Sequence, residues 1–98
     1  IPFLKNRFNV RIGYSDHTIG TVACIGAAAL GAELIEKHFT LDKTLEGSDH
    51  ILSADPAELA EIVHGCNRIS TQLGTETKAP TAEEIDNKQI MRSLFIET

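Results

Sequence analysis

Two short β-forming segments enclose one apolar helical segment near the start of the chain, and this order limits the possible folds more than any other feature. The first strand is expected at Val10–Tyr14 and the second at Ala32–Phe39. Between them, from Thr18 or Ile19 to Leu30, the chain is dense in Ala, Ile, Val and Leu. A strand, a helix and a second strand in this order are typical of a βαβ unit with parallel strands. The sequence therefore predicts an α/β fold.

The central helical segment is nearly all apolar, so we expect it to be buried. Gly20 and Gly26 lie within it, and each lowers helix propensity by roughly 1 kcal/mol relative to Ala. We therefore expect these glycines to mark close packing against a sheet. Gly31 follows the segment, at a place where glycine commonly ends a helix.

Helices are also expected on both sides of this unit. The apolar spacing in Ile1–Phe8 suits the end of a helix that leads into the first strand. A second helix is expected from Pro56 to Leu73. Asp55 lies at its N-cap position and Glu58 three residues further on, which is the pattern of a capping box.

The chain changes character after this helix. Thr75–Pro80 is expected to be a linker. Thr81 and Glu84 are placed to cap a short polar helix that runs to about Met91. Arg92–Thr98 has the composition of a strand, but the sequence offers it no partner.

The predicted sheet is too small to stand alone. Parallel sheets are normally covered on both faces, and two strands do not make a stable one. The 98 residues can bury one modest core, and the sequence opens on Ile1-Pro2 without an initiator Met. We therefore expect the chain to be part of a longer protein.

Composition excludes several classes of function. With 42% hydrophobic and 23% charged residues, the chain is typical of a globular protein rather than a disordered one. The net charge of −5 argues against binding to nucleic acid, which needs clustered Lys and Arg. Cys24 and Cys66 lack a CxxC pattern and are expected to be reduced core thiols. No segment resembles a membrane span or a signal peptide, so we expect a cytoplasmic protein.

Two histidines lie where the predicted strands end. Period-two alternation puts Ser15 and His17 on one face of the first strand, and Glu36 and His38 on one face of the second. Parallel strand ends meet at one edge, and neutral imidazole is a common metal ligand. On spacing alone, the histidines could bind a metal or be ordinary polar residues. Glu36 could support such ligands from behind or form a structural ion pair.

Three strings carry a resemblance to a known family. They are Gly13-Tyr14-Ser15-Asp16-His17-Thr18, Ile35-Glu36-Lys37-His38-Phe39-Thr40-Leu41-Asp42 and Gly47-Ser48-Asp49-His50. In residues and spacing, the chain resembles the sialic acid synthase family (N-acetylneuraminate synthase and its relatives) over nearly its whole length.

The resemblance implies a place in a larger fold. The family's catalytic domain is a TIM (β/α)8 barrel, and this chain is similar to its C-terminal segment. Residues 10–14 and 32–39 would be strands seven and eight, and residues 56–73 the closing helix. Residues 1–74 would then be a partial barrel, and residues 75–98 a linker and short helix leading toward an antifreeze-like domain that this sequence lacks.

The resemblance also implies a reaction and a set of site residues. Family enzymes condense phosphoenolpyruvate with N-acetylmannosamine or a related amino sugar to give a nine-carbon sialic acid and phosphate. His17 and His38 would be the catalytic pair, binding Mn²⁺ or Mg²⁺ that polarises the sugar aldehyde. Ser15 would donate a hydrogen bond to phosphoenolpyruvate, Asp49 would bind the acceptor sugar, and Glu36 would support the ligands. The full-length enzyme would be a homodimer.

Some residues near the site keep a second interpretation. Asp49 could instead cap its loop, which is a common use of Asp in turns. His50 is expected to order the same loop, and Gly47 to supply a backbone conformation that other residues resist.

The chain also departs from the family pattern. A TIM barrel needs about 250 residues, so six strand–helix units are missing, together with the lysines that hold phosphoenolpyruvate in relatives. Met91-Arg92-Ser93-Leu94 stands where relatives often have paired arginines before Ser-Leu. We therefore expect the isolated chain to be inactive. Two alternatives are a non-catalytic remnant that serves assembly and a different metal-dependent enzyme, such as a hydrolase.

Overall fold

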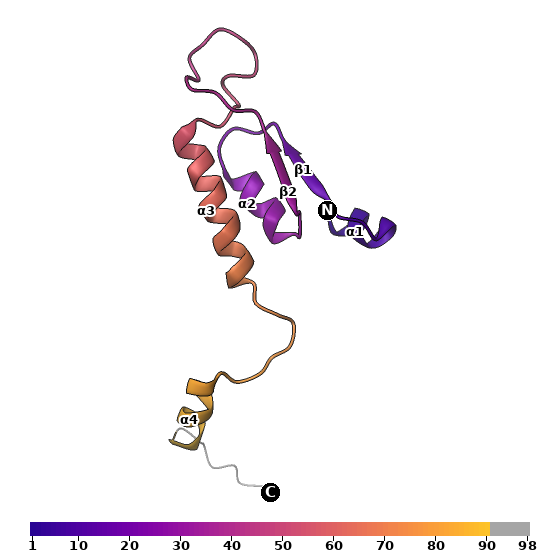
Figure 1. Cartoon of the computed structure of the whole chain (residues 1–98), viewed down its shortest axis with the longest axis vertical. Helices are drawn as coiled ribbons and strands as arrows, with labels where there is room; N and C mark the ends of the chain where they lie inside the picture. The colour runs from indigo at the N-terminus through magenta and orange to yellow at the C-terminus, as the bar shows by residue number, and fades with distance from the viewer. Residues whose placement is uncertain (91–98) are drawn as a thin grey trace, which may run out of the picture.

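The computed structural model describes residues 1–90. They form a short parallel sheet, with helices before, between and after its two strands in the sequence (Figure 1). The predicted α/β class is confirmed. The expectations for Met91 and for Arg92–Thr98 lie outside the described residues. The elements in chain order are α1 (Pro2–Phe8), β1 (Gly13–Asp16), α2 (Val22–Ala29), β2 (Leu34–Lys37), α3 (Pro56–Gln72) and α4 (Ala82–Ile90).

Strands β1 and β2 pair in parallel, from Gly13 opposite Leu34 to Asp16 opposite Lys37. Strand β1 therefore starts three residues later than the predicted Val10. The reason is the position at which the partner strand, β2, begins. The Glu33 amide donates to the Ile12 carbonyl at 2.8 Å, and β2 begins only after that residue, so residues 10–12 have no strand beside them in the described region.

Helices α2 and α3 pack against each other, and α2 also packs on both strands. Both strands point toward the end of the molecule that carries the long loop after β2 (Figure 1). The buried apolar residues are few and small: Cys24, Ala27, Ala54 and Ile62. Ile35 of β2 and Cys66 of α3 pack against this core. Both cysteines are free thiols, with Cys24 buried and Cys66 half-buried, so the prediction of reduced thiols is confirmed.

Helix α2 is less buried than its composition suggests. Only one side of it packs on α3 and the sheet, and Val22 at its start remains 82% exposed. The expectation that Gly20 and Gly26 mark close packing is wrong for the described residues, because a Cβ at either position would meet nothing within 4 Å in residues 1–90. The close approach lies instead at Gly65 of α3, where a Cβ would be 2.8 Å from Ile25 Cγ1.

Helix α3 begins as predicted. The Asp55 carboxylate accepts from the Glu58 amide at 2.8 Å, and the Glu58 carboxylate accepts from the Asp55 amide at 3.2 Å, which completes the capping box. Glu58 also forms an ion pair with Lys43, which ties the preceding loop to the start of α3. Helix α4 is capped in the same way by Thr81 and Glu84.

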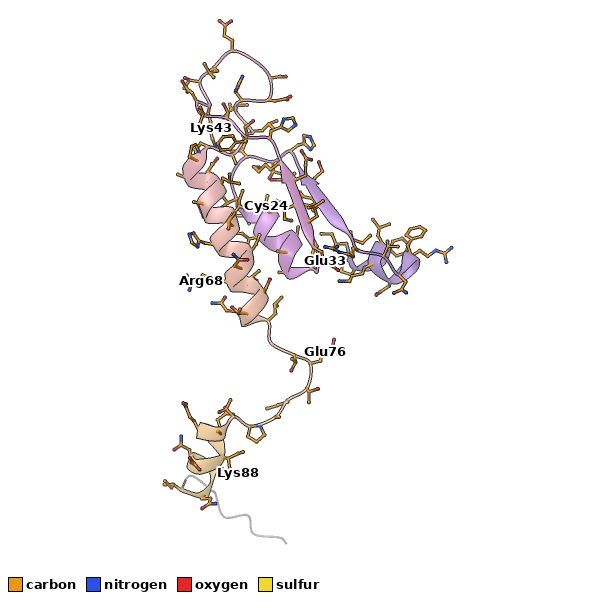
Figure 2. The ribbon with its side chains drawn as sticks, viewed as in Figure 1. Cys24, Glu33, Lys43, Arg68, Glu76 and Lys88 are labelled. Atoms are coloured by element: carbon orange, nitrogen blue, oxygen red, sulfur yellow. The ribbon has the colours of Figure 1, made fainter. Side chains whose placement is uncertain are left out.

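Surface ion pairs hold the N-terminal segment beside the start of β2. The shared acceptor is Glu33, which is labelled in Figure 2. Lys5 Nζ lies 3.2 Å from Glu33 Oε1, and Arg11 Nε lies 2.8 Å from Glu33 Oε2. These two bonds lower the pKa of Glu33 below its ordinary value. The side chains are well exposed, so each pair contributes little to stability.

The two terminal helices stand apart from the rest. In residues 1–90, neither α1 nor α4 packs on another helix or strand, and α4 lies beyond the linker at the far end of the molecule (Figure 1). The chain accordingly extends over 73 × 33 × 24 Å. None of the helices described here has the length and apolarity needed to cross a bilayer.

Candidate functional site

The two histidines follow directly after the paired strand ends. Asp16 and Lys37 are opposite each other in the sheet, and His17 and His38 are the next residues along each strand. The two imidazole rings lie edge to face, with centroids 5.4 Å apart and planes inclined at 61°. The structure therefore brings together the two side chains that the alternation of the strands predicts.

Ser15 and Glu36 lie on the same face of the sheet as the histidines. Each is two residues before the histidine that follows its own strand. They are register partners, and the Ser15 hydroxyl donates a hydrogen bond to Glu36 Oε2. Both are exposed, as is His17, while His38 is half-buried. We call Ser15, His17, Glu36 and His38 the histidine face. Glu36 makes no ion pair within the described region, so the ion-pair interpretation finds no support there.

The histidine face suits a divalent metal as an incomplete set of ligands. Two imidazoles at this separation are close enough to share one ion, and Glu36 is next to them as a carboxylate. Across residues 1–90, no three His, Cys, Asp or Glu side chains gather into a complete donor set. Any further ligands would come from substrate, water or other parts of a larger protein.

The opposite face of the sheet carries a buried polar network that the sequence analysis missed. Asp16 is fully buried, and its Oδ2 lies 2.6 Å from Lys37 Nζ and accepts from Cys24 Sγ at 3.3 Å. Its Oδ1 accepts from Thr18 and from the Tyr14 hydroxyl. We call Asp16, Lys37, Thr18, Tyr14 and Cys24 the Asp16–Lys37 network. The signal available in the sequence was that Asp16 and Lys37 alternate away from the histidines, toward the apolar helices.

This network shifts the pKa values of Asp16, Cys24 and Tyr14. Burial by itself would raise the pKa of Asp16, but the hydrogen bonds from Lys37, Thr18 and Cys24 together hold it well below its ordinary value. Burial, together with the bond to Asp16, raises the pKa of Cys24 to about 11. The bond to Asp16 also raises the pKa of Tyr14. Cys24 is therefore a neutral thiol at pH 7 and a poor nucleophile.

The loop from Leu41 to Ser53 follows β2 and is closed at its base. Phe39 and Ala54 form an isolated parallel bridge, in which the Ala54 amide donates to the His38 carbonyl at 2.8 Å and the Thr40 amide to the Ala54 carbonyl at 2.9 Å. Inside the loop, a ring nitrogen of His50 lies 2.9 Å from Thr40 Oγ1. The bonding of His50 agrees with a role in ordering the loop.

Gly47 lies at the tip of this loop with a φ of 138°, a conformation that disfavours residues with a Cβ. A Cβ at this position would also lie 3.0 Å from Cδ2 of His50. The expectation that Gly47 supplies an unusual backbone conformation is therefore confirmed.

Asp49 is exposed in the same loop, and its hydrogen bonds in residues 1–90 go to Ser48 and Ser53 rather than to the histidine face. Its carbonyl accepts from the Ser53 amide at 3.1 Å and from Ser53 Oγ at 2.5 Å. Within residues 1–90, the hydrogen bond recorded for its carboxylate is a long one, from Ser48 Oγ at 3.5 Å. The backbone of Asp49 therefore orders the turn, and its carboxylate stays available to a ligand.

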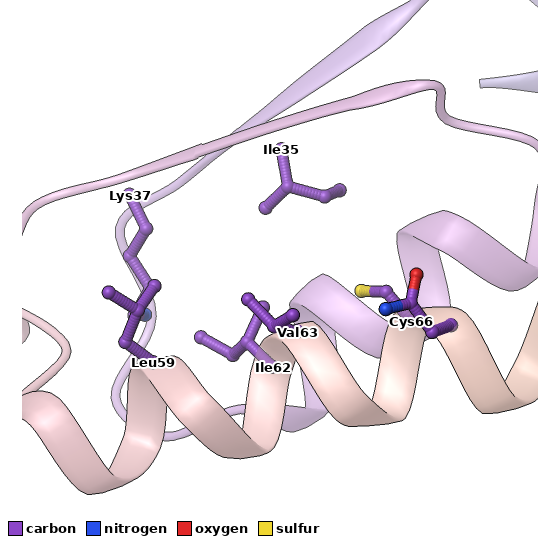
Figure 3. A pocket seen from close by; sticks show the side chains of 7 residues that line it. Ile35, Lys37, Leu59, Ile62, Val63 and Cys66 are labelled. Atoms are coloured by element: carbon purple, nitrogen blue, oxygen red, sulfur yellow. The ribbon is translucent and has the colours of Figure 1, made fainter.

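A cavity of about 310 Å³ lies on the helix-covered side of the sheet rather than at the histidines. Side chains of β2 and α3 point toward each other across it (Figure 3). It is lined by Ile35, Lys37, Leu59, Ile62, Val63, Cys66 and Asn67. The cavity is mainly apolar and reflects incomplete packing of α3 on β2.

Several known proteins are similar to this chain in sequence. A model of the NeuB family matches residues 1–78. An uncharacterized protein of Methanocaldococcus jannaschii is 51% identical over 86 residues, which cover 88% of this chain and 26% of that protein. The N,N'-diacetyllegionaminic acid synthase of Legionella pneumophila is 40% identical over 89 residues, which cover 91% of this chain and 25% of the synthase.

A solved structure shares the fold. The N-acetylneuraminic acid (sialic acid) synthetase of Leptospira borgpetersenii, in complex with citrate, aligns with a TM-score of 0.78 and 44% identity. The alignment covers 94% of this chain and 33% of the synthetase. The chain spans about a quarter of the length of the curated relatives it matches.

Proposed function

This chain belongs to the NeuB family, and on that basis we propose that its histidine face is part of the active site of a sialic-acid-type synthase. The enzyme would condense phosphoenolpyruvate with an amino sugar to give a nine-carbon sugar acid and phosphate. The observation that carries the proposal is the pairing of His17 and His38, 5.4 Å apart at the ends of neighbouring strands. The names of the similar synthases point to the same class of reaction.

The histidines would hold the metal of this reaction. His17 and His38 would bind one Mn²⁺ or Mg²⁺ through ring nitrogens, with the remaining ligands coming from outside the described residues. A bound divalent ion supplies Lewis acidity toward the aldehyde oxygen of the open-chain sugar. Glu36 would accept a hydrogen bond beside the pair and add negative charge that favours a cation.

Ser15 and Asp49 would bind the substrates. The Ser15 hydroxyl now donates to Glu36, and it would donate to phosphoenolpyruvate when that substrate is bound. The exposed carboxylate of Asp49, on a loop ordered by its own backbone, would accept hydrogen bonds from hydroxyl groups of the acceptor sugar. Ser15 lies near the C-terminal end of β1 and Asp49 in the loop after β2, the side of the sheet where parallel α/β barrels keep their active sites.

We further propose that β1 and β2 are strands seven and eight of a TIM barrel and that α3 is its closing helix. The two-stranded sheet and its small core support this, because a parallel sheet is normally covered on both faces. Residues 75–98 would lead toward an antifreeze-like domain, and the complete enzyme would be a cytoplasmic homodimer.

The proposal is tested on the full-length protein that carries this chain. Purified protein is incubated with Mn²⁺, phosphoenolpyruvate and a panel of amino sugars, including N-acetylmannosamine and diacetylated precursors of legionaminic and pseudaminic acid. We expect phosphate release that depends on one of the sugars. His17→Ala and His38→Ala should each reduce it by at least about 100-fold, since a metal supplies several kcal/mol of transition-state stabilisation.

The matched control is His64→Ala, which removes an exposed imidazole from the outer side of α3 and should leave the rate unchanged. Full activity in both His17→Ala and His38→Ala would refute the metal site. Phosphate release without any sugar would indicate a hydrolase instead.

A further inference from the structure

A buried ion pair lies directly behind the histidine face. Lys37 Nζ and Asp16 Oδ2 are 2.6 Å apart, and their side chains are 4% and 0% exposed. Asp16 immediately precedes His17, and Lys37 immediately precedes His38. The ion pair therefore links the two residues that immediately precede the histidines.

The same two side chains also hold the backbone beyond His17. Lys37 Nζ donates a second bond, to the Thr18 carbonyl at 2.6 Å. Asp16 Oδ1 accepts from the Thr18 amide at 3.0 Å and from its hydroxyl at 2.8 Å. The residue before His17 and the residue after it are thus fixed to the strand that carries His38.

The network is complete in the described part of the chain. Cys24 and Tyr14 donate to the remaining positions on the Asp16 carboxylate, and no buried side-chain nitrogen or oxygen in residues 1–90 lacks a partner. A fully bonded buried network favours one arrangement of its members. A buried ion pair adds little stability over a well-packed apolar pair, so stability alone does not account for it.

We propose that Asp16 and Lys37 are positioning residues, which hold His17 and His38 in the relative placement needed to bind one divalent ion. This inference rests on the function proposed above. Neither side chain touches the ion, because both lie on the opposite face of the sheet. Their effect passes through the backbone of the two strand ends.

A purely structural ion pair would make thermal stability and metal affinity rise and fall together. With a positioning role, the two can change independently. Lys37→Met leaves the Asp16 carboxylate buried and unpaired, so both thermal stability and metal affinity should fall. Asp16→Val combined with Lys37→Met leaves no unpaired charge, so much of the thermal stability should return. The bonds that fix Thr18 stay absent in the double variant, so metal affinity should remain low.

The experiment measures the Mn²⁺ dissociation constant by electron paramagnetic resonance, and the melting temperature of the metal-free protein, for full-length wild type and each variant. We expect the double variant to bind Mn²⁺ about 10–100-fold more weakly than wild type, the usual effect of losing groups that support metal ligands. Lys37→Met, which loses the bonds to Asp16 and to the Thr18 carbonyl, should weaken Mn²⁺ binding in the same direction.

The matched control is Lys5→Met. Lys5 Nζ likewise bonds a carboxylate, Glu33, and a carbonyl, that of Gly31, but it lies far from the strand ends that carry the histidines. The Mn²⁺ affinity of Lys5→Met should equal that of wild type.

A double variant that binds Mn²⁺ as tightly as wild type would overturn the inference. If that variant fails to fold, wild-type affinity in Lys37→Met, which loses the bonds to Asp16 and to the Thr18 carbonyl, would overturn it instead. Absence of sugar-dependent phosphate release in wild type refutes the proposed function separately. In that case, Mn²⁺ binding that depends on His17 and His38 still allows the positioning role to be tested.

Discussion

The charge on the Asp16 carboxylate makes stability depend on pH. Burial opposes ionisation, but the bond from Lys37, with those from Thr18 and Cys24, holds the pKa well below the ordinary 3.8. A carboxyl group with a lower pKa in the folded state contributes stability that is fully present above its unfolded pKa. That contribution is lost as the pH falls through the folded pKa.

Acid should therefore destabilise the protein partly through Asp16. Between pH 5 and pH 2, we expect the melting temperature of wild type to fall more steeply than that of Asp16→Asn, which has no carboxyl group to protonate there. Thermal unfolding followed by circular dichroism across this pH range measures both slopes. Asp42→Asn is the control, because Asp42 also has a lowered pKa, through bonds from Thr44, but is exposed. Equal slopes in wild type and Asp16→Asn would contradict the prediction.

At the level of single residues, alternation along the strands was enough to group the histidine face. Ser15, His17, Glu36 and His38 share a face because every second residue of a strand does. The partner of Asp16 was not predictable in the same way. Lys37 lies 21 residues further along the chain, and their contact depends on the exact register of two strands whose boundaries the sequence located only approximately.

Among the elements, the contact between α2 and α3 depends on one glycine. A Cβ at Gly65 would lie 2.8 Å from Ile25 Cγ1 and nearer still to Cδ1. The position of Cγ1 is set by χ1, which is stiff for a β-branched residue in a helix. The two helices therefore approach more closely at this point than a larger residue allows.

Gly65→Ala should destabilise the protein although alanine is the better helix former. We expect a loss of about 1–3 kcal/mol from overpacking, seen as a lower melting temperature. Gly26→Ala is the matched control, because its Cβ would meet nothing within 4 Å in residues 1–90, and this variant should gain up to about 1 kcal/mol of stability. In an Ile25→Ala background, Gly65→Ala should no longer be destabilising. A melting temperature raised by Gly65→Ala alone would show that the helices separate freely.

Local signals predicted the elements unevenly. The start of α3 was correct to the residue because Asp55, Pro56 and Glu58 encode it within four positions. The start of β1 was wrong because a strand begins where its partner begins, and that depends on β2. Gly65 was overlooked because a glycine inside a helical pattern does not reveal which neighbour approaches it.

The whole molecule leaves much apolar surface open. In the described region, large apolar side chains remain exposed at the sheet and at both ends of α2, including Leu34 at 68% and Val22 at 82%. The buried core is limited to four small or medium-sized residues. Such a chain has little stability of its own to hold a substrate site in place.

The isolated 98-residue chain should therefore be inactive. We expect no sugar-dependent phosphate release from the purified chain under conditions in which the full-length protein turns over. The measurement is product formation at equal molar concentrations, with chain mixed with a separately produced N-terminal part of the protein as a second sample. Recovery on mixing would support a shared barrel. Sialic acid formation by the chain alone would contradict the prediction.

The sequence predicted the fold class of the whole molecule but not its packing. Periodicity indicates which segments are strands and helices, and the order of these segments suggests parallel pairing. The number of neighbouring strands is decided by contacts that a chain of this length does not contain. The assignment to strands seven and eight therefore came from resemblance and remains a proposal.

The bridge between Phe39 and Ala54 makes the loop that carries Asp49 a unit that can be exchanged. Its two ends are hydrogen-bonded to each other, so residues 44–52 should tolerate lengthening or replacement with little effect on β2 or α3, at a small entropic cost. Lys43 is kept, because it pairs with Glu58 at the start of α3. If Asp49 binds the acceptor sugar, as we propose, transplanting this loop between synthases that use different sugars should shift acceptor preference while leaving the histidines untouched.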